Sequence, residues 1–395
     1  MKITAIKLFP ISLTPIKTGY RSQDALSQLA RVNTVIVQIE TDKDIVGWGE
    51  AATIPSYFNQ TLGTLMDWLG GYAQALIGLD PRNIIQVHRR IDLVSGERPP
   101  GCQPARAAID MALYDIIGKV NNCPVYEVLG GAYRTEFELQ TNLYEESPEE
   151  KANACRAYVE KGFAGLKVKV GDSILLKGFS AANLEWERKK LLAALEAVPP
   201  NIYIDADANQ TWGNAKIAVK IVEHILQGTF YPNLSLEQPL HHLDFSGHSY
   251  LRKILPIPII LDESVVSPEA MLQIVKMEAA DRIVLKINRV GGFWFAKKIV
   301  DICEAACIGI SIDTMPFTKL GDTAHCHLAA TIRDPYPVDA EGHTWFAATP
   351  FTGGVEIQGG KAVLPRRPGL GVELDEKLLK KMLISYPAQI SWGVI

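Results

Sequence analysis

Three acidic residues stand where short apolar segments of the sequence end. Asp207 closes the segment from Asn201, Glu237 closes the segment from Asn233, and Asp262 closes the segment from Ile257. If these segments are parallel strands, their carboxyl ends lie together and the three carboxylates converge. Converging carboxylates repel one another unless a cation binds them, and Mg²⁺ prefers oxygen ligands. The sequence therefore predicts a metal site with Mg²⁺, or alternatively Mn²⁺, as cofactor; helix capping or surface ion pairing is the other explanation.

Three lysines end similar segments. Lys167 and Lys169 are two residues apart, so they share one face of a strand, and Lys286 ends a segment much later in the chain. Buried lysines are costly unless they are paired or used chemically. Partial burial beside a cation is expected to lower a lysine pKa toward the range of a general base. Lys169 and Lys286 are the expected bases, whereas Lys167 could serve only to pair with Asp205, Asp262 or Glu263.

The elements that must position these residues repeat as one apolar strand followed by one helix-length segment. This alternation is typical of a (β/α)₈ barrel, in which functional side chains gather at the carboxyl ends of the strands. The expected strands are 136–142, 165–171, 201–209, 233–237, 257–262, 282–286, 308–313 and 343–346. The expected helices begin at Ser147 and span 183–197, 213–226, 244–254, 267–278, 293–306 and 320–332.

Strands also precede the barrel and follow it. Strand-like segments at 2–13, 34–40 and 45–50 are followed by helical patterns at 60–77, 81–95 and 103–120. This order favours an α+β capping domain over 1–125, ahead of a barrel catalytic domain over 126–350. The glycine- and proline-rich segment 351–395 is expected to pack back on the capping domain.

The composition excludes several classes of protein. The 395 residues carry a formal net charge of −4, which provides no basic surface for nucleic acid and no polybasic membrane patch. No apolar run approaches the roughly 20 residues of a membrane helix. The six cysteines are scattered, as in a reduced cytoplasmic protein. We expect a soluble, cytoplasmic protein.

The remaining candidates are weaker as individual residues. Asp313 ends the strand at 308–313, Trp345 lies on or beside the last strand, and Tyr20 and Tyr57 lie in two loops near the N-terminus. We predict that these four residues, together with Phe317, contact the substrate. Asn209 shares a strand face with Asp207, and Glu263 follows Asp262, so both are expected just behind the metal ligands. His325 and His327 lie two residues apart on a helix and are not expected to bind a metal together.

With these residues in place, the chain resembles the enolase superfamily, and in particular its muconate lactonizing enzyme subgroup. Lys167-Val-Lys169 looks like the subgroup's Lys-x-Lys motif, and Lys286, followed by Val290-Gly-Gly292, looks like its second lysine. The metal-ligand motifs are similar to Asp207-Ala-Asn209, Glu237-Gln-Pro239 and Asp262-Glu-Ser264. The resemblance implies a capping domain on a modified barrel. It also implies Mg²⁺-assisted removal of the α-proton of a carboxylate substrate, an enediolate intermediate stabilised with the help of Lys167, and a homo-oligomer.

The substrate is less well defined by the motifs. Many subgroup members carry glutamate where Phe317 stands in Met315-Pro-Phe317, and Asp339-Ala-Glu341 only partly matches the Asp-x-Asp with which dipeptide epimerases bind an ammonium. An acid and aromatic rings, as in Asp313, Trp345 and Tyr57, look more like members that act on proline betaines and hydroxyprolines. We expect a racemase or epimerase of an amino-acid derivative: an N-modified amino acid, a proline betaine or a dipeptide. The alternatives are a cycloisomerase of the muconate type, a hydroxy-amino-acid dehydratase and a catalytically idle binding scaffold.

Overall fold

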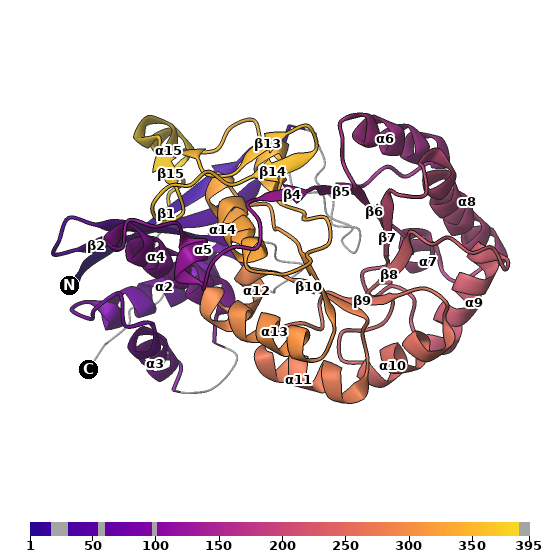
Figure 1. The fold of residues 1–395 in the computed structure, drawn as a ribbon, viewed down its shortest axis with the longest axis horizontal. Coiled ribbons are helices and arrows are strands. Elements are labelled where there is room, and N and C mark those ends of the chain that lie inside the picture. Colours follow the sequence, from indigo (N-terminus) through magenta and orange to yellow (C-terminus); the bar gives the residue numbers. More distant parts are fainter. Residues whose placement is uncertain (17–30, 54–59, 97–100, 387–395) are drawn as a thin grey trace.

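The computed structural model describes residues 1–16, 31–53, 60–96 and 101–386. Figure 1 shows an antiparallel sheet with its helices beside a ring of parallel strands, which is surrounded by a second layer of helices. This arrangement confirms the predicted α/β fold, a modified (β/α)₈ barrel with a capping sheet.

The first sheet is antiparallel and has the order β1 (Ile3–Leu13), β2 (Val32–Thr41) and β3 (Val46–Ala52). Helices α2 (Leu62–Leu76), α3 (Ile84–Val94) and α4 (Gln103–Val120) follow it. Small residues let α4 approach β3 closely: a Cβ built on Gly47 would lie 2.2 Å from the carbonyl oxygen of Ala112, and one on Gly49 would lie 1.8 Å from that of Ala108. The glycines of β3 are therefore required by its contact with α4.

The barrel contains seven parallel strands whose order around the ring follows the sequence. They are β5 (Gln140–Leu143), β6 (Gly165–Lys169), β7 (Tyr203–Asp207), β8 (Leu234–Glu237), β9 (Ile259–Leu261), β10 (Arg282–Leu285) and β11 (Gly309–Ile312). The outer layer consists of α6 (Pro148–Glu160), α8 (Ala181–Ala197), α9 (Ala215–Leu226), α10 (Phe245–Ile254), α11 (Pro268–Met277), α13 (Phe293–Ala305) and α14 (Lys319–Ala330). Shorter elements are α5 (Val125–Val128), β4 (Glu136–Glu138), α7 (Asp172–Lys177) and α12 (Ile287–Val290).

The eighth position of the ring is not where the sequence pattern predicted it. The predicted strand 343–346 is wrong, because Gly342–Trp345 forms the 3₁₀ helix η1. Instead, Val338 and Asp339 form parallel bridges to Leu139 and Asp313, and the Gln140 N–H donates to the Val338 carbonyl oxygen at 2.9 Å. Two residues are too short to show a strand period, and the prolines around them have no N–H to donate to a ladder.

The C-terminal segment contributes strands to two small sheets. Its elements are β12 (Phe351–Gly353), β13 (Glu356–Gln358), β14 (Lys361–Val363), β15 (Val372–Leu374) and α15 (Glu376–Met382). β14 pairs with β4, while Leu383 forms a bridge with Ile11 of β1. The segment thus touches both the barrel side and the first sheet. The domain boundaries at 125 and 350 stay predictions.

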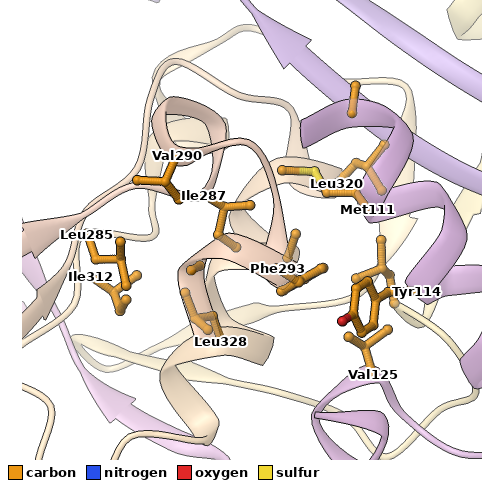
Figure 2. Close-up of a cluster of buried hydrophobic side chains, with 14 of the residues drawn as sticks. Met111, Tyr114, Val125, Leu285, Ile287, Val290, Phe293, Ile312, Leu320 and Leu328 are labelled. Atoms are coloured by element: carbon orange, nitrogen blue, oxygen red, sulfur yellow. The ribbon is translucent and has the colours of Figure 1, made fainter. Parts of the chain in front are cut away.

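A continuous apolar cluster joins the first sheet's helices to the barrel (Figure 2). Met111 and Tyr114 of α4 lie near Phe293 of α13, and Ile287 and Leu328 lie beside the same group. The Tyr114 and Phe293 rings contact edge to face, with centroids 5.2 Å apart. Because every member is buried, the end of β10 is held by packing from α4, α13 and α14.

Buried carboxylates complete the same interface by accepting backbone N–H groups. Asp110 of α4 accepts the Phe293 N–H at 2.5 Å, and Asp115 accepts those of Trp48 at 3.0 Å and Leu370 at 2.8 Å. Such acids supply partners to helix and loop N–H groups that would otherwise be buried without one.

Candidate functional site

The lysines and acids lie at the strand ends on one mouth of the barrel. Lys169 is the register partner of Asp207, and Asp207 is the register partner of Glu237 on the next strand. Strands β6 and β10 are separated by three ring positions in either direction, through β7–β9 or through β5, the 338–339 segment and β11. Lys169 and Lys286, which end or follow these two strands, therefore belong to opposite sides of the ring.

Lys167 reaches across the ring and is fully buried. Its Nζ lies 2.9 Å from Glu237 Oε1, 3.0 Å from Asp313 Oδ2 and 4.0 Å from Asp205 Oδ2. Its contact with Asp313, which follows β11, is an ion pair across the interior of the barrel. Of its three predicted pairing partners, Asp205 is confirmed.

The other two lysines each contact a predicted metal ligand. Lys169 forms an ion pair with Asp207 and donates to Asn209 Oδ1 at 3.1 Å. Lys286 Nζ lies 2.6 Å from Asp262 Oδ2 and 3.0 Å from Asp313 Oδ2. The two amines thus flank the carboxylate group from different strands.

The geometry of the acids fits a divalent cation. Among the described residues, oxygens of Glu237, Asp262 and Asp313 lie within 4.8 Å of one another. Glu237 is fully buried, and its Oε2 has no hydrogen-bond partner among those residues. A buried carboxylate oxygen without a donor is costly in the protein alone, and a bound cation would satisfy it. Asp207 neighbours this group through Glu237 rather than belonging to it.

Neighbouring charges shift the pKa values of these acids in different directions. Burial raises the pKa of Asp313, but Lys167 and Lys286 outweigh burial and hold that pKa well below its usual range. Burial also opposes ionisation of Asp262, but Arg289 and Lys286 outweigh it, so the pKa of Asp262 is lowered. In Glu237, burial and repulsion by Asp205 prevail, and its pKa is well above the usual value. Glu237 is the acid that gains most from added positive charge.

The lysine pKa values shift in the direction opposite to the expected one. Burial lowers the pKa of Lys286, but Asp262 and Asp313 more than offset burial and raise it. Burial likewise opposes protonation of Lys169, yet attraction by Asp207 raises its pKa. The pKa of Lys167 is raised in the same way, chiefly by Asp313. The expected fall concerns lysines beside a bound cation and stays a prediction. The charges that the protein itself supplies act in the opposite direction, because a carboxylate oxygen lies within 3.0 Å of each ammonium.

Two local backbone features hold the acids in place. Asn209 and Gln238 have positive φ values of 41° and 38°, which turn the chain sharply after β7 and β8. The buried Gln238 Oε1 accepts the backbone N–H of Asp262 at 2.9 Å. This side chain therefore fixes the end of β9 against the end of β8. Asn209 also reaches Glu263, its Nδ2 lying 3.4 Å from Glu263 Oε1.

The predicted substrate contacts have different outcomes. Tyr20 and Tyr57 lie outside the described residues. Phe317 is fully buried in a cluster with Ala52 and Met315. The Trp345 side chain is half-buried and hydrogen-bonds Glu341, while Asp313 is neutralised by two lysines. Their contact with substrate stays a prediction.

Two acids at and beside the eighth position, Asp339 and Glu341, were not among the predicted site residues. Asp339 accepts from Asn142 Nδ2 at 2.5 Å, and Glu341 accepts from Thr141. Burial, reinforced by Asp313, raises the pKa of Asp339 well above its usual value, and burial raises that of Glu341 to about 7. The partial match of Asp339-Ala-Glu341 to Asp-x-Asp is the sequence signal for these acids, which precede the predicted strand 343–346.

A small cavity of about 30 Å³ lies beside Lys169. Its lining consists of one tyrosine, three acids and three lysines: Tyr144, Glu145, Glu146, Asp172, Lys151, Lys169 and Lys190. This volume is enough for about one water molecule.

The cap, the barrel and the lysines and acids on facing strand ends define a member of the enolase superfamily. A family model described as enolase C-terminal domain-like matches residues 149–378, and the N-terminal domain model of mandelate racemase and muconate lactonizing enzyme matches residues 11–130. The chain belongs to the mandelate racemase/muconate lactonizing enzyme family.

Two relatives illustrate how far the similarity extends. An N-succinyl-L-Arg/Lys racemase from Bacillus cereus is 31% identical over 97% of this chain and 98% of its own, and its crystal structure superposes with a TM-score of 0.87. A dipeptide epimerase from Enterococcus faecalis, solved with Mg and L-Leu-L-Tyr, is 30% identical with a TM-score of 0.84, covering 94% of this chain and 99% of that chain. Enzymes of this superfamily bind a divalent metal. No helix in the described part of the chain is long and apolar enough to cross a membrane.

Proposed function

We propose that this protein is a Mg²⁺-dependent racemase or epimerase of an N-acylated amino acid or dipeptide. It removes the α-proton from one face of the α-carbon and delivers a proton to the opposite face. The supporting observation is the placement of Lys169 and Lys286 on opposite sides of one ring of carboxylates. That the chain is an isomerase of the enolase superfamily follows from its racemase and epimerase relatives.

The two lysines divide the proton transfers between them. A cation bound to Asp207 would offset the negative charge that raises the pKa of Lys169. Neutral Lys169 then removes the α-proton from one antipode, and protonated Lys286 delivers a proton to the other face; the reverse reaction exchanges their roles. Lys167 places a third positive charge beside Glu237 and so stabilises the enediolate form of the substrate.

Asp207, Glu237 and Asp262 are the residues that would hold Mg²⁺, or Mn²⁺ in its place. Asp313 lies within 4.8 Å of Glu237 and Asp262, but it is already paired with Lys167 and Lys286, whereas Asp207 is the register partner of Glu237. When bound, the ion supplies positive charge that polarises the substrate carboxylate and stabilises the charge that develops on its oxygens. Asn209 supports this group because its side chain accepts a hydrogen bond from Lys169, which pairs with Asp207. Glu263 supports it indirectly, because it accepts a hydrogen bond from Asn209.

The charges at the mouth favour a substrate with an uncharged nitrogen. Asp313 is already paired with Lys167 and Lys286, the pKa of Asp339 lies well above its usual value, and the pKa of Glu341 is raised to about 7, so neither Asp339 nor Glu341 is fully ionised near neutral pH. These positions therefore favour an N-acylated amino acid over a betaine and over a dipeptide, whose ammonium needs an ionised acid. The similarity to an N-succinyl-L-Arg/Lys racemase supports N-acylated lysine or arginine as the substrate.

The test is a chiral assay with Mg²⁺ on a panel of N-succinyl amino acids, dipeptides, proline betaine, cis-3-hydroxyproline and muconolactone. We expect racemisation or epimerisation of N-acyl acids, and loss of activity with EDTA. Lactone turnover or dehydration as the main reaction would replace this proposal by the cycloisomerase or the dehydratase alternative. No reaction with any acid would favour the idle scaffold. The homo-oligomeric state and the cytoplasmic location stay predictions.

A further inference from the structure

The residue after Lys286 is held by a histidine from another element. Lys286 precedes the single-turn helix α12, whose first N–H, that of Ile287, has no partner within the helix. This N–H donates to His325 Nε2 of α14 at 3.1 Å. His325 is fully buried, and its Nδ1 lies 2.8 Å from the carbonyl oxygen of Gly321. Since a carbonyl can only accept, Nδ1 carries the proton and Nε2 is the acceptor.

We infer that His325 is a positioning residue for Lys286: by accepting the Ile287 N–H, it fixes the backbone from which the lysine reaches the substrate. This inference rests on the proposed function, because it concerns the base on the β10 side of the ring.

The support for His325 continues to the first sheet. The Gly321 N–H donates to Glu50 Oε2 of β3 at 3.1 Å, while the Gly321 carbonyl accepts from His325. Glu50 also accepts the Thr318 N–H at 2.9 Å. A chain of hydrogen bonds thus runs from β3 through α14 to the residue after Lys286.

Packing restricts the same group from the sides. The Phe317 ring lies against His325, with ring centroids 5.3 Å apart. The Ile287 side chain is fully buried in the cluster that includes Phe293 and Leu328 (Figure 2). The imidazole therefore has little freedom to find another partner, and neither has the Ile287 N–H.

The same helix provides a matched control. His327 is also buried; its Nδ1 accepts the Tyr126 N–H at 3.2 Å, and its Nε2 lies 3.3 Å from the Leu370 carbonyl oxygen. Its environment resembles that of His325, but it holds α5 and the C-terminal segment rather than the end of β10. Replacing either histidine by leucine removes one buried backbone acceptor.

The test measures α-hydrogen exchange into recovered substrate in D₂O with Mg²⁺, separately for N-succinyl-L-arginine and N-succinyl-D-arginine. Lys169→Ala and Lys286→Ala identify which antipode each lysine serves. In His325→Leu, exchange of the antipode served by Lys286 should fall about tenfold or more, since a displacement of about 1 Å can cost about a hundredfold. Exchange of the other antipode should change less than about threefold, and His325→Gln, whose amide oxygen can accept the same N–H, should restore the loss.

The outcomes separate this role from general damage. His327→Leu should affect both antipodes equally, whatever its effect on stability. Equal losses for both antipodes in His325→Leu, or no restoration by glutamine, would overturn the positioning role while leaving the proposed function intact. Absence of exchange in the unaltered protein with both antipodes and with the whole panel would overturn the proposed function, and this inference with it.

Discussion

Replacing Lys167 by methionine tests whether the charges of the barrel mouth compensate one another. Methionine keeps an unbranched apolar stem of similar size, so packing is retained while the ammonium is lost. In the unaltered protein, Lys167 Nζ lies 2.9 Å from Glu237, 3.0 Å from Asp313 and 4.0 Å from Asp205. The substitution leaves these three acids without the ammonium that they share. Only 1% of the lysine side chain is exposed, so water cannot take over its role.

The expected cost follows from this burial. Removing one partner of a buried ion pair costs about 3–5 kcal/mol, because the remaining charge stays desolvated. A surface pair contributes at most about 1 kcal/mol. Lys7→Met, which breaks the pair of an exposed lysine with Glu40 at 2.6 Å, is therefore the matched control.

Urea unfolding of both variants with EDTA measures the two losses of unfolding free energy. Lys167→Met should lose several times as much as Lys7→Met. Added Mg²⁺ should stabilise Lys167→Met more than the unaltered protein, because a cation restores charge beside the same carboxylates. A loss no larger than that of Lys7→Met, or no extra gain with Mg²⁺, would refute this account of the site.

Two further predictions concern other buried groups. Burial raises the pKa of Glu50 from 4.5 to about 7. The folded state thus binds the proton more tightly than the unfolded state, so the stabilisation is complete below pH 4.5 and is lost as the pH rises to 7. Glu50→Gln should remove about 3 kcal/mol of that pH dependence, measured as the difference between the variants' unfolding free energies across this range; parallel pH profiles would contradict it. Gln238→Leu leaves the buried Asp262 N–H without its acceptor. It should weaken Mg²⁺ binding about 10–100-fold by calorimetry, as changes behind metal ligands do, and unchanged affinity would show that Gln238 does not hold the ligand.

The sequence predicted the barrel well where the strands were long enough to show a pattern. The strands ending at Asp207 and Glu237 are short segments rich in apolar residues. Because parallel strand ends must meet at one edge, the convergence of the acids followed from the topology. The eighth position is two residues long and lies among prolines, so neither hydrophobic period nor β propensity marked it. Of the predicted strand 343–346, the first three residues lie in the 3₁₀ helix that ends at Trp345, and Phe346 directly follows it.

The parts of the site that the sequence did not predict depend on contacts between distant residues. The raised pKa of Lys286 reflects two carboxylates from β9 and β11, which no local pattern places at 2.6 and 3.0 Å. The role of His325 likewise depends on a distant contact. The Ile287 N–H, which has no partner within α12, finds its acceptor in His325 only because α14 packs beside it.

The central claim is that Lys169 and Lys286 act on opposite faces of one carbon acid. The most direct measurement is α-hydrogen exchange in D₂O with Mg²⁺ for both antipodes of the best substrate, in Lys169→Ala and Lys286→Ala. We predict complementary results, with each variant losing exchange from one antipode and keeping it with the other, while neither interconverts the antipodes. Loss of exchange from the same antipode in both variants, or interconversion that survives either change, would contradict the two-base arrangement.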